Sequence, residues 1–211
     1  MSTIEAIAQA IETCKTRQVP GLVQEALDAG IAPIDILNKG MIDAMTVVGE
    51  RFKANEIFVP EMLVAAKGMK KGVEVLKPYL GSDSDIRVGK MAMGTVYGDL
   101  HDIGKNLVIM MIESSGFEVV DLGIDVSVDT FLRAADDPET NIIGVSALLT
   151  TTMPAMKDIV EHLNQHPRRS EFKIMVGGAP ITQEFADEIG ADIYTSDAAS
   201  AAQAAKTLAV H

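Results

Sequence analysis

Through about the first 80 residues, apolar side chains recur at every third or fourth position, which is the spacing of one face of an α-helix. Three of the four segments with this spacing have a proline near their start, where a missing amide donor costs nothing: Pro20, Pro33 and Pro60. The apolar positions of the four segments run over Ile4–Ile11, Leu22–Leu27, Leu37–Val48 and Met62–Leu76. Four short helices with short connections predict an N-terminal four-helix bundle.

The remainder of the chain alternates short apolar runs with helical stretches. The predicted strands are Val88–Val96, Glu118–Leu122, Ile142–Ala147, Lys173–Val176 and, more weakly patterned, Asp192–Tyr194. The predicted helices are Gly104–Ser115, Val128–Ala135, Pro154–Gln165, Thr182–Ile189 and Ala198–Val210. Strict alternation predicts a parallel sheet with helices on both faces, as in Rossmann-like and flavodoxin-like α/β domains. The small and acidic residues Gly81–Asp85 interrupt both patterns, so we expect a helical domain with its linker at 1–85 and an α/β domain at 86–211.

The charge and the cysteine content narrow the classes of function. A net charge of −12 opposes binding to nucleic acid and to anionic membranes, so the expected partners are proteins and small molecules. The single cysteine, Cys14, cannot form an internal disulfide, which fits a reducing cytoplasm. The sequence shows neither a signal peptide nor an apolar run long enough to span a membrane, and we expect a soluble, cytoplasmic protein.

Three clusters of small and polar residues follow predicted strands. They are Gly98–Asn106 after the first strand, Ser146–Thr152 after the third and Gly177–Pro180 after the fourth. Ligands of such sheets bind beyond the carboxyl ends of the strands, where the strand order reverses, so we expect these clusters to converge. Taken singly, a glycine pair or a serine at the end of a strand is a weak signal.

The first cluster holds the candidate metal ligand, His101. In an extended loop Asp99 and His101 have the same parity, so the carboxylate can meet the imidazole Nδ1 and leave Nε2 free for a metal. Gly98 and Gly104 would let the backbone approach a bulky ligand. One histidine is too few for a zinc or iron site made of protein alone, so a cofactor such as a macrocycle would supply the other ligands. The alternative is a solvated turn or a local hydrogen bond.

Together the three clusters resemble the cobalamin-binding signature Asp-x-His-x-x-Gly, Ser-x-Leu and Gly-Gly. This signature is shared by methionine synthase, the corrinoid proteins of methyltransferase systems and the base-off mutases. The intervals, residues 105–145 and 149–176, resemble those of the methyltransferase branch. The first half also resembles the helical module that covers the upper corrin face in methionine synthase, through Val47–Phe52 and Phe58–Pro60. Ordinary core packing at helical spacing is the alternative for that module.

The resemblance implies that a cobalamin or related corrinoid is bound base-off, with His101 as the lower axial ligand of cobalt and Asp99 bonded to His101. The upper-face cap would include Phe52 and Val59, and Thr152 would extend the ligand triad. The cofactor-binding residues that it implies are Gly98, Asp99, His101, Asp102, Ile103, Gly104, Ser146, Leu148, Thr150, Thr152, Gly177 and Gly178, with Tyr194, Asp197 and Ala198 at the last strand.

The implied function is that of a methyl carrier, not of an enzyme that acts alone. The implied partners are a substrate:corrinoid methyltransferase, an acceptor methyltransferase that uses tetrahydrofolate or a thiol, and a reductive activase. The donor would be methanol, a methylamine, a betaine or a methoxyarene, and the sequence does not select among them. The alternatives are the cobalamin-binding subunit of an adenosylcobalamin mutase, a cobalamin-dependent sensor, and a flavodoxin-like interaction domain without a metal.

Overall fold

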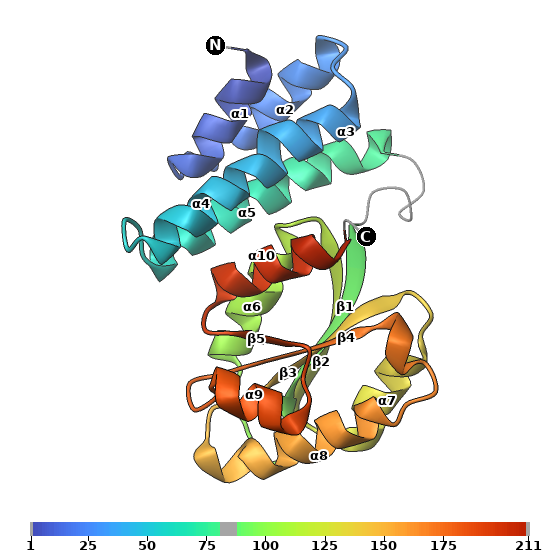
Figure 1. Cartoon of the computed structure of the whole chain (residues 1–211). Coiled ribbons are helices and arrows are strands. Elements are labelled where there is room, and N and C mark those ends of the chain that lie inside the picture. The colour runs from blue at the N-terminus through green and yellow to red at the C-terminus, as the bar shows by residue number, and fades with distance from the viewer. Residues whose placement is uncertain (1, 81–87, 210–211) are drawn as a thin grey trace. The chain divides into compact units, whose positions relative to one another are not determined.

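The computed structural model describes residues 2–80 and 88–209 (Figure 1). The chain divides into two compact units, an N-terminal helical unit and an α/β unit that begins at Val88. The linker predicted at Gly81–Asp85 lies outside the described residues.

The helical unit contains the four helices that the apolar spacing predicts. They are α1 (Thr3–Glu12), α2 (Val19–Asp28), a helix that runs from α3 (Pro33–Asp35) through a π-helical segment (Ile36–Ile42) into α4 (Asp43–Lys53), and α5 (Val59–Leu76). Ser2 begins α1 with a capping box, since its hydroxyl accepts from the amide of Glu5 and the Glu5 carboxylate accepts from the amide of Ser2. Methionines fill much of the core between the helices, including the buried Met41, Met62 and Met69.

The α/β unit has a five-stranded, fully parallel sheet with the order β2-β1-β3-β4-β5. The strands are β1 (Gly89–Val96), β2 (Phe117–Val126), β3 (Thr140–Ser146), β4 (Lys173–Gly177) and β5 (Ile193–Thr195). The helices are α6 (Ile103–Glu113), α7 (Val128–Asp136), α8 (Met153–Asn164), α9 (Gln183–Ile189) and α10 (Ala198–Ala209). Every predicted strand and helix of this half is present, and the Rossmann-like fold is confirmed.

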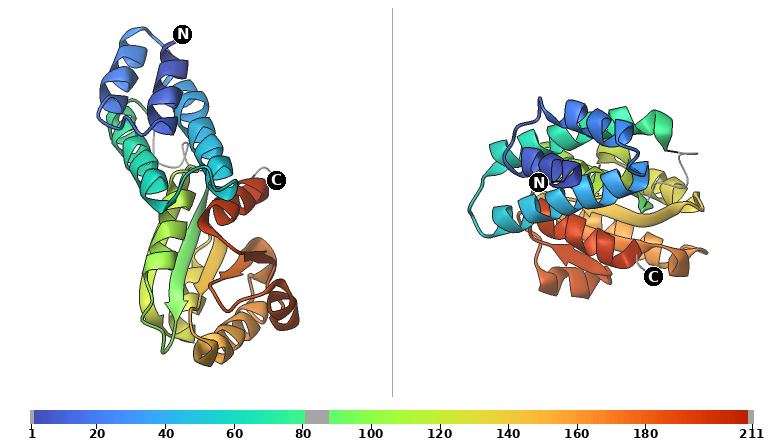
Figure 2. Two further views of the ribbon diagram at one scale, coloured as in Figure 1. Left: turned by 90° about the vertical axis from the view of Figure 1, so that its left-hand side faces the viewer. Right: turned by 90° about the horizontal axis from the view of Figure 1, so that it is seen from above.

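Helices cover both faces of the sheet. On one face, the side chains of Ala92, Val96, Ile143 and Val145 belong to a core with residues of α7, α8 and α9. The opposite face of the sheet packs on α6, and α6 packs on α10 (Figures 1 and 2). Because successive side chains of a strand alternate between faces, Met91, Met93 and Thr95 of β1 point to the face of α6.

The prediction for β2 was too short. We expected the strand to end at Leu122, whereas it continues to Val126. Its second half is irregular, since Gly123 and Asp125 have positive φ and the register against β1 shifts there. A strand that contains a glycine and two aspartates has little strand propensity, and its pairing with the interior strand β1 overrides that propensity.

Candidate functional site

The switch point of the sheet lies at the carboxyl ends of β1 and β3. The chain leaves β1 through α6 to reach β2 on one side, whereas β3 lies on the other side of β1. After β1 and β3 the chain therefore continues to opposite faces of the sheet, and a ligand can enter the crevice between the two loops. The segments Gly98–Gly104 and Ser146–Leu148, predicted as parts of one site, meet at this place.

The buried carboxylate of Asp99 joins the two loops. Its Oδ2 accepts hydrogen bonds from the amide of Leu148 at 2.8 Å, the amide of Leu149 at 3.3 Å and the hydroxyl of Thr152 at 2.9 Å. Its Oδ1 accepts from the amide of His101 at 3.1 Å. Burial raises the pKa of Asp99, but these four hydrogen bonds together lower the pKa below its ordinary value. Asp99 is therefore a carboxylate at neutral pH.

The imidazole of His101 stands beside this carboxylate. Its Nδ1 lies 3.7 Å from Asp99 Oδ1, longer than a hydrogen bond, and the side chain is 48% exposed. Its Nε2 makes no hydrogen bond within the described part of the chain. No group of three or more His, Cys, Asp or Glu side chains that could hold a metal occurs among residues 2–80 and 88–209. A metal bound to His101 would thus take its other ligands from a cofactor.

The sequence reasoning missed two residues that hold the loop, Thr95 and Asp125. The buried Thr95 donates from Oγ1 to the carbonyl oxygen of His101 at 2.7 Å. The Asp125 carboxylate accepts from the amide of Gly98 at 2.7 Å, and the amide of Asp125 donates to the Asp99 carbonyl at 3.1 Å. The signal for Thr95 was a hydroxyl in an apolar strand. Asp125 had no signal, because it lies beyond the predicted end of its strand.

A row of small residues crosses the carboxyl end of the sheet. The strand register pairs Thr95 with Ser146, Ser146 with Gly177, and Gly177 with Thr195. By strand alternation this row points to the face of α6. The Ser146 hydroxyl makes no hydrogen bond to any described residue. Short side chains and an uncommitted hydroxyl fit an extended polar ligand that lies close to the backbone.

Two glycines of the predicted site differ in what surrounds them. At Gly178 φ is +131°, and an added Cβ would lie 1.8 Å from the carbonyl oxygen of Ala147, so this position requires glycine for packing alone. At Gly104 an added Cβ would meet nothing within 4 Å, and φ is not positive. The protein itself gives no reason for a glycine at position 104, whereas a bulky ligand beside α6 does.

Large apolar side chains are exposed around His101. Leu100 is 71% exposed, Ile103 72% and Tyr97 65%, and Leu149 is exposed on the loop after β3. Apolar side chains gathered at the end of a sheet mark a surface that a ligand or a partner covers. The site thus combines a free imidazole nitrogen with an apolar surface, which fits a large macrocycle that carries a metal.

The other predicted residues contribute in different ways. Thr150 is exposed in a short 3₁₀ turn, Thr150–Thr152, that brings Thr152 onto Asp99. The Asp102 carboxylate accepts a long hydrogen bond, 3.4 Å, from Asn106 in the first turn of α6. Asp197 caps α10, since its carboxylate accepts from the amide and the hydroxyl of Ser200.

Four further predicted residues do not belong to the loop that carries His101. Tyr194 is partly exposed in β5, and Ala198 is the buried first residue of α10. In the helical unit, the cap candidates Phe52, near the end of α4, and Val59, which begins α5, are both partly exposed.

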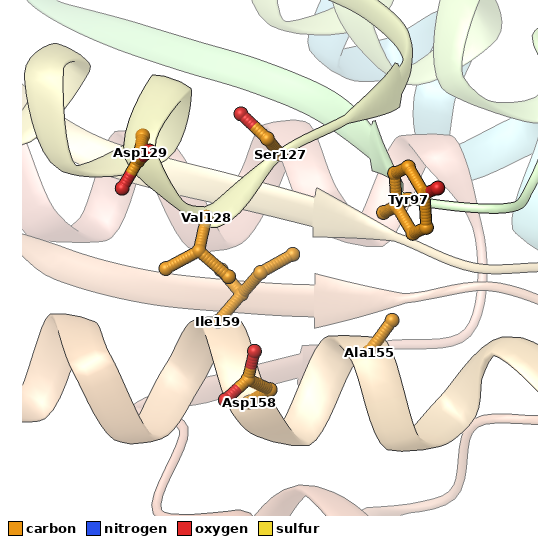
Figure 3. A pocket seen from close by; sticks show the side chains of 7 residues that line it. All are labelled: Tyr97, Ser127, Val128, Asp129, Ala155, Asp158 and Ile159. Carbon is orange, nitrogen blue, oxygen red and sulfur yellow. The ribbon is translucent and has the colours of Figure 1, made fainter.

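A separate pocket of about 320 Å³ lies on the other face of the sheet (Figure 3). Its lining comes from Tyr97, from the start of α7 and from α8: Ser127, Val128, Asp129, Ala155, Asp158 and Ile159. Val128 and Ile159 point toward each other across it. None of the predicted site residues lines this pocket, so the candidate site is the row and loop at the switch point.

The fold and this site define a B12-binding α/β domain preceded by a helical module. Two family models, each described as a B12 binding domain, match residues 89–206 and 3–77. Among the described residues, no helix has the length and apolar character needed to cross a membrane.

The relatives narrow this class further. Dimethylamine corrinoid protein 1 of Methanosarcina acetivorans is 42% identical over 97% of this chain and 96% of its own length. Trimethylamine corrinoid protein 1 of the same organism is 44% identical over 84% of this chain and 83% of its own length. A chain of the methanol:cobalamin methyltransferase complex from Methanosarcina barkeri superposes with a TM-score of 0.85 at 30% identity, over 99% of this chain and 80% of that one. The chain belongs to the corrinoid proteins of methyltransferase systems, and its cofactor is cobalamin or a related corrinoid.

Proposed function

We propose that this chain binds its corrinoid base-off, with His101 as the lower axial ligand of cobalt, and carries a methyl group between two methyltransferases. The observation that carries the proposal is the state of His101, whose Nε2 makes no hydrogen bond within the described residues while its backbone amide and carbonyl are both held from within the protein. A ring nitrogen left free in a rigid loop is suited to bind a metal that arrives with its other ligands.

The residues around His101 have separate tasks in this proposal. Asp99 stays ionised beside the imidazole, 3.7 Å from Nδ1, and favours the tautomer with its proton on Nδ1, which leaves the lone pair of Nε2 for cobalt. The exposed Leu100 and Ile103 would lie against the macrocycle, and the free hydroxyl of Ser146 would bind the nucleotide tail beside Gly177. The bound corrinoid supplies the cobalt that takes up and gives away the methyl group, and the protein supplies binding and orientation.

The donor class that we propose is a methylated amine. Two relatives that align with this chain at 42% and 44% identity carry the names of dimethylamine and trimethylamine corrinoid proteins. The methanol complex shares the fold at 30% identity and supports a substrate methyltransferase as the partner. A second methyltransferase would pass the methyl group to tetrahydrofolate or a thiol, and a reductive activase would restore the oxidised cofactor.

The helical unit is proposed as the cap of the upper corrin face, with Phe52 and Val59 as apolar shields of the methyl group. Both side chains are partly exposed, which leaves apolar surface to cover a ligand. The cap must uncover the methyl group for each partner, so movement between a domain at 1–85 and one at 86–211 belongs to this proposal.

The ligand assignment is tested by the electron paramagnetic resonance spectrum of the protein reconstituted with cobalamin and reduced to cobalt(II). The wild type should show a signal split by one protein nitrogen, and His101→Ala should lose the splitting while it keeps its fold. His162→Ala is the matched control, because His162 is an exposed histidine on α8 that contacts Asp158. Splitting that persists in His101→Ala, or no bound corrinoid in the wild type, would refute the assignment.

The donor class is tested with isotope-labelled methyl donors. Reduced holoprotein is mixed with a dimethylamine, a trimethylamine or a methanol methyltransferase and the matching donor, and label on the corrinoid protein is counted. Label from an amine and not from methanol supports the proposal. Label from methanol alone would exclude an amine as the donor, and the assignment of His101 as the cobalt ligand would still stand.

A further inference from the structure

Thr95 is a buried hydroxyl in the otherwise apolar second part of β1. The last six residues of β1, Met91–Val96, are all buried, and Thr95 is the polar side chain among them, with 0% exposure. Its Oγ1 donates a hydrogen bond of 2.7 Å to the carbonyl oxygen of His101, six residues further along the chain. The strand thus reaches forward and binds the backbone of the loop that follows it.

His101 is held on both sides of its Cα atom. Its amide donates to Asp99 Oδ1 at 3.1 Å, and its carbonyl accepts from Thr95 at 2.7 Å. The two bonds have independent anchors, since Asp99 is fastened to the loop after β3 and Thr95 is part of β1, an interior strand of the sheet. The backbone of His101 is therefore fixed even though its ring is half exposed.

We propose that Thr95 is a positioning residue that holds the backbone of His101 where the imidazole reaches the cobalt. This inference rests on the proposed role of His101 as the axial ligand. Without the bond from Thr95, the carbonyl side of His101 is free to rotate, and ordering it again on cofactor binding costs conformational entropy. The geometry of a metal ligand depends on the groups that orient it, so Thr95 tunes the cobalt–imidazole bond without touching the cofactor.

If the hydroxyl only stabilised the fold, its removal would destabilise the apoprotein and leave the ligand unaffected. The structure favours the opposite result. His101 is an exposed residue, so its carbonyl can bind water when the partner hydroxyl is removed. Valine has the shape and strand propensity of threonine, and the ladder that pairs Thr95 with Ser146 uses backbone groups only. Thr95→Val should therefore change the stability of the apoprotein little and act on the ligand instead.

The test compares Thr95→Val, which removes the donor, with Thr95→Ser, which restores it. Thr95→Ala removes the same donor without added volume and replaces the valine variant if that variant does not fold. Thr140→Val is the matched control, because Thr140 is a buried threonine at the amino end of the same sheet, 2% exposed. Each protein is titrated with cob(II)alamin, and the share of the nitrogen-split resonance signal is measured at saturation.

Thr95→Val should weaken binding of cob(II)alamin about fivefold, the size expected for one neutral hydrogen bond, and should lower the nitrogen-split share. Thr95→Ser and Thr140→Val should stay close to the wild type in both measurements. A wild-type affinity and a wild-type split share in Thr95→Val would overturn the inference, and so would an equal loss in Thr95→Ser. If the wild type itself lacks the splitting, the role of His101 fails and this inference fails with it. If the wild type is split, His101→Ala is not, and Thr95→Val matches the wild type, this inference alone fails.

Discussion

Replacement of Gly104 by alanine should raise the stability of the apoprotein and lower its affinity for the corrinoid. Gly104 lies in the first turn of α6, its φ is not positive, and a Cβ there would meet nothing within 4 Å. Alanine fits without strain and reduces the conformational freedom of the unfolded chain, which raises the free energy of unfolding by about 0.4–1 kcal/mol. The effect on the apoprotein is therefore small and favourable.

The effect on the cofactor has the opposite sign. If the space beside Gly104 belongs to the corrinoid, the new methyl group stands between α6 and the ligand. Overpacking by one methyl group costs about 1–3 kcal/mol, which corresponds to a roughly 5- to 150-fold weaker affinity. The two quantities are measured by urea unfolding of the apoprotein and by titration with cobalamin.

Gly21→Ala is the control for this pair of measurements. Gly21 lies in the first turns of α2, and its Cβ would also meet nothing within 4 Å. This variant should gain similar stability and bind cobalamin like the wild type. An unchanged affinity of Gly104→Ala would refute the reasoning, because the open space beside α6 would then not be the place of the cofactor.

Two further predictions concern residues in loops next to the strands. Gly178→Ala should lower the free energy of unfolding by about 3 kcal/mol, because its Cβ would lie 1.8 Å from the Ala147 carbonyl at a φ that alanine rarely adopts; a loss below about 1 kcal/mol in urea would contradict this. The hydrogen bond that Lys90 donates at 2.8 Å lowers the pKa of Asp137 from its ordinary value of 3.8. The ionised Asp137 therefore stabilises the fold above pH 3.8, and this stabilisation is lost as the pH falls through the lower pKa of the folded state. Asp137→Asn should flatten this part of the acid unfolding curve followed by circular dichroism, and an unchanged curve would exclude the pair as a source of the pH dependence.

Much of the fold could be predicted because its signals are local. The period of three and four fixed the helices of the N-terminal unit, and alternation of strand and helix fixed the parallel sheet. The π-helical segment Ile36–Ile42 had no signal, since a widened turn leaves the apolar spacing of a short segment almost unchanged. The far end of β2 was missed because its pairing with β1, not its composition, makes it a strand.

The motifs of the sequence named candidate residues of the site, but they did not reveal all of the hydrogen bonds that these residues make. The ordered motifs pointed to Asp99, His101 and Ser146 and to their convergence. The sequence suggested a carboxylate bonded to the imidazole ring, whereas Asp99 lies 3.7 Å from the ring and makes its hydrogen bonds to three amides and to Thr152. Backbone donors carry no residue identity, so no side-chain pattern could have revealed them.

The distribution of buried polar groups explains why His101 can be both exposed and well placed. Of the seven buried polar or charged residues among those described, Thr95, Asp99 and Thr152 all serve the one loop that carries His101. Buried hydroxyls and carboxylates are costly unless they are bonded, and no buried side-chain nitrogen or oxygen in the described part of the chain lacks a partner. Such a bonded network fixes the backbone of the loop while it leaves Nε2 and the apolar side chains around it uncovered. If His101 binds cobalt as proposed, it is held before the cofactor arrives and loses little freedom on binding, so the affinity for cobalt would depend on residues that never touch it.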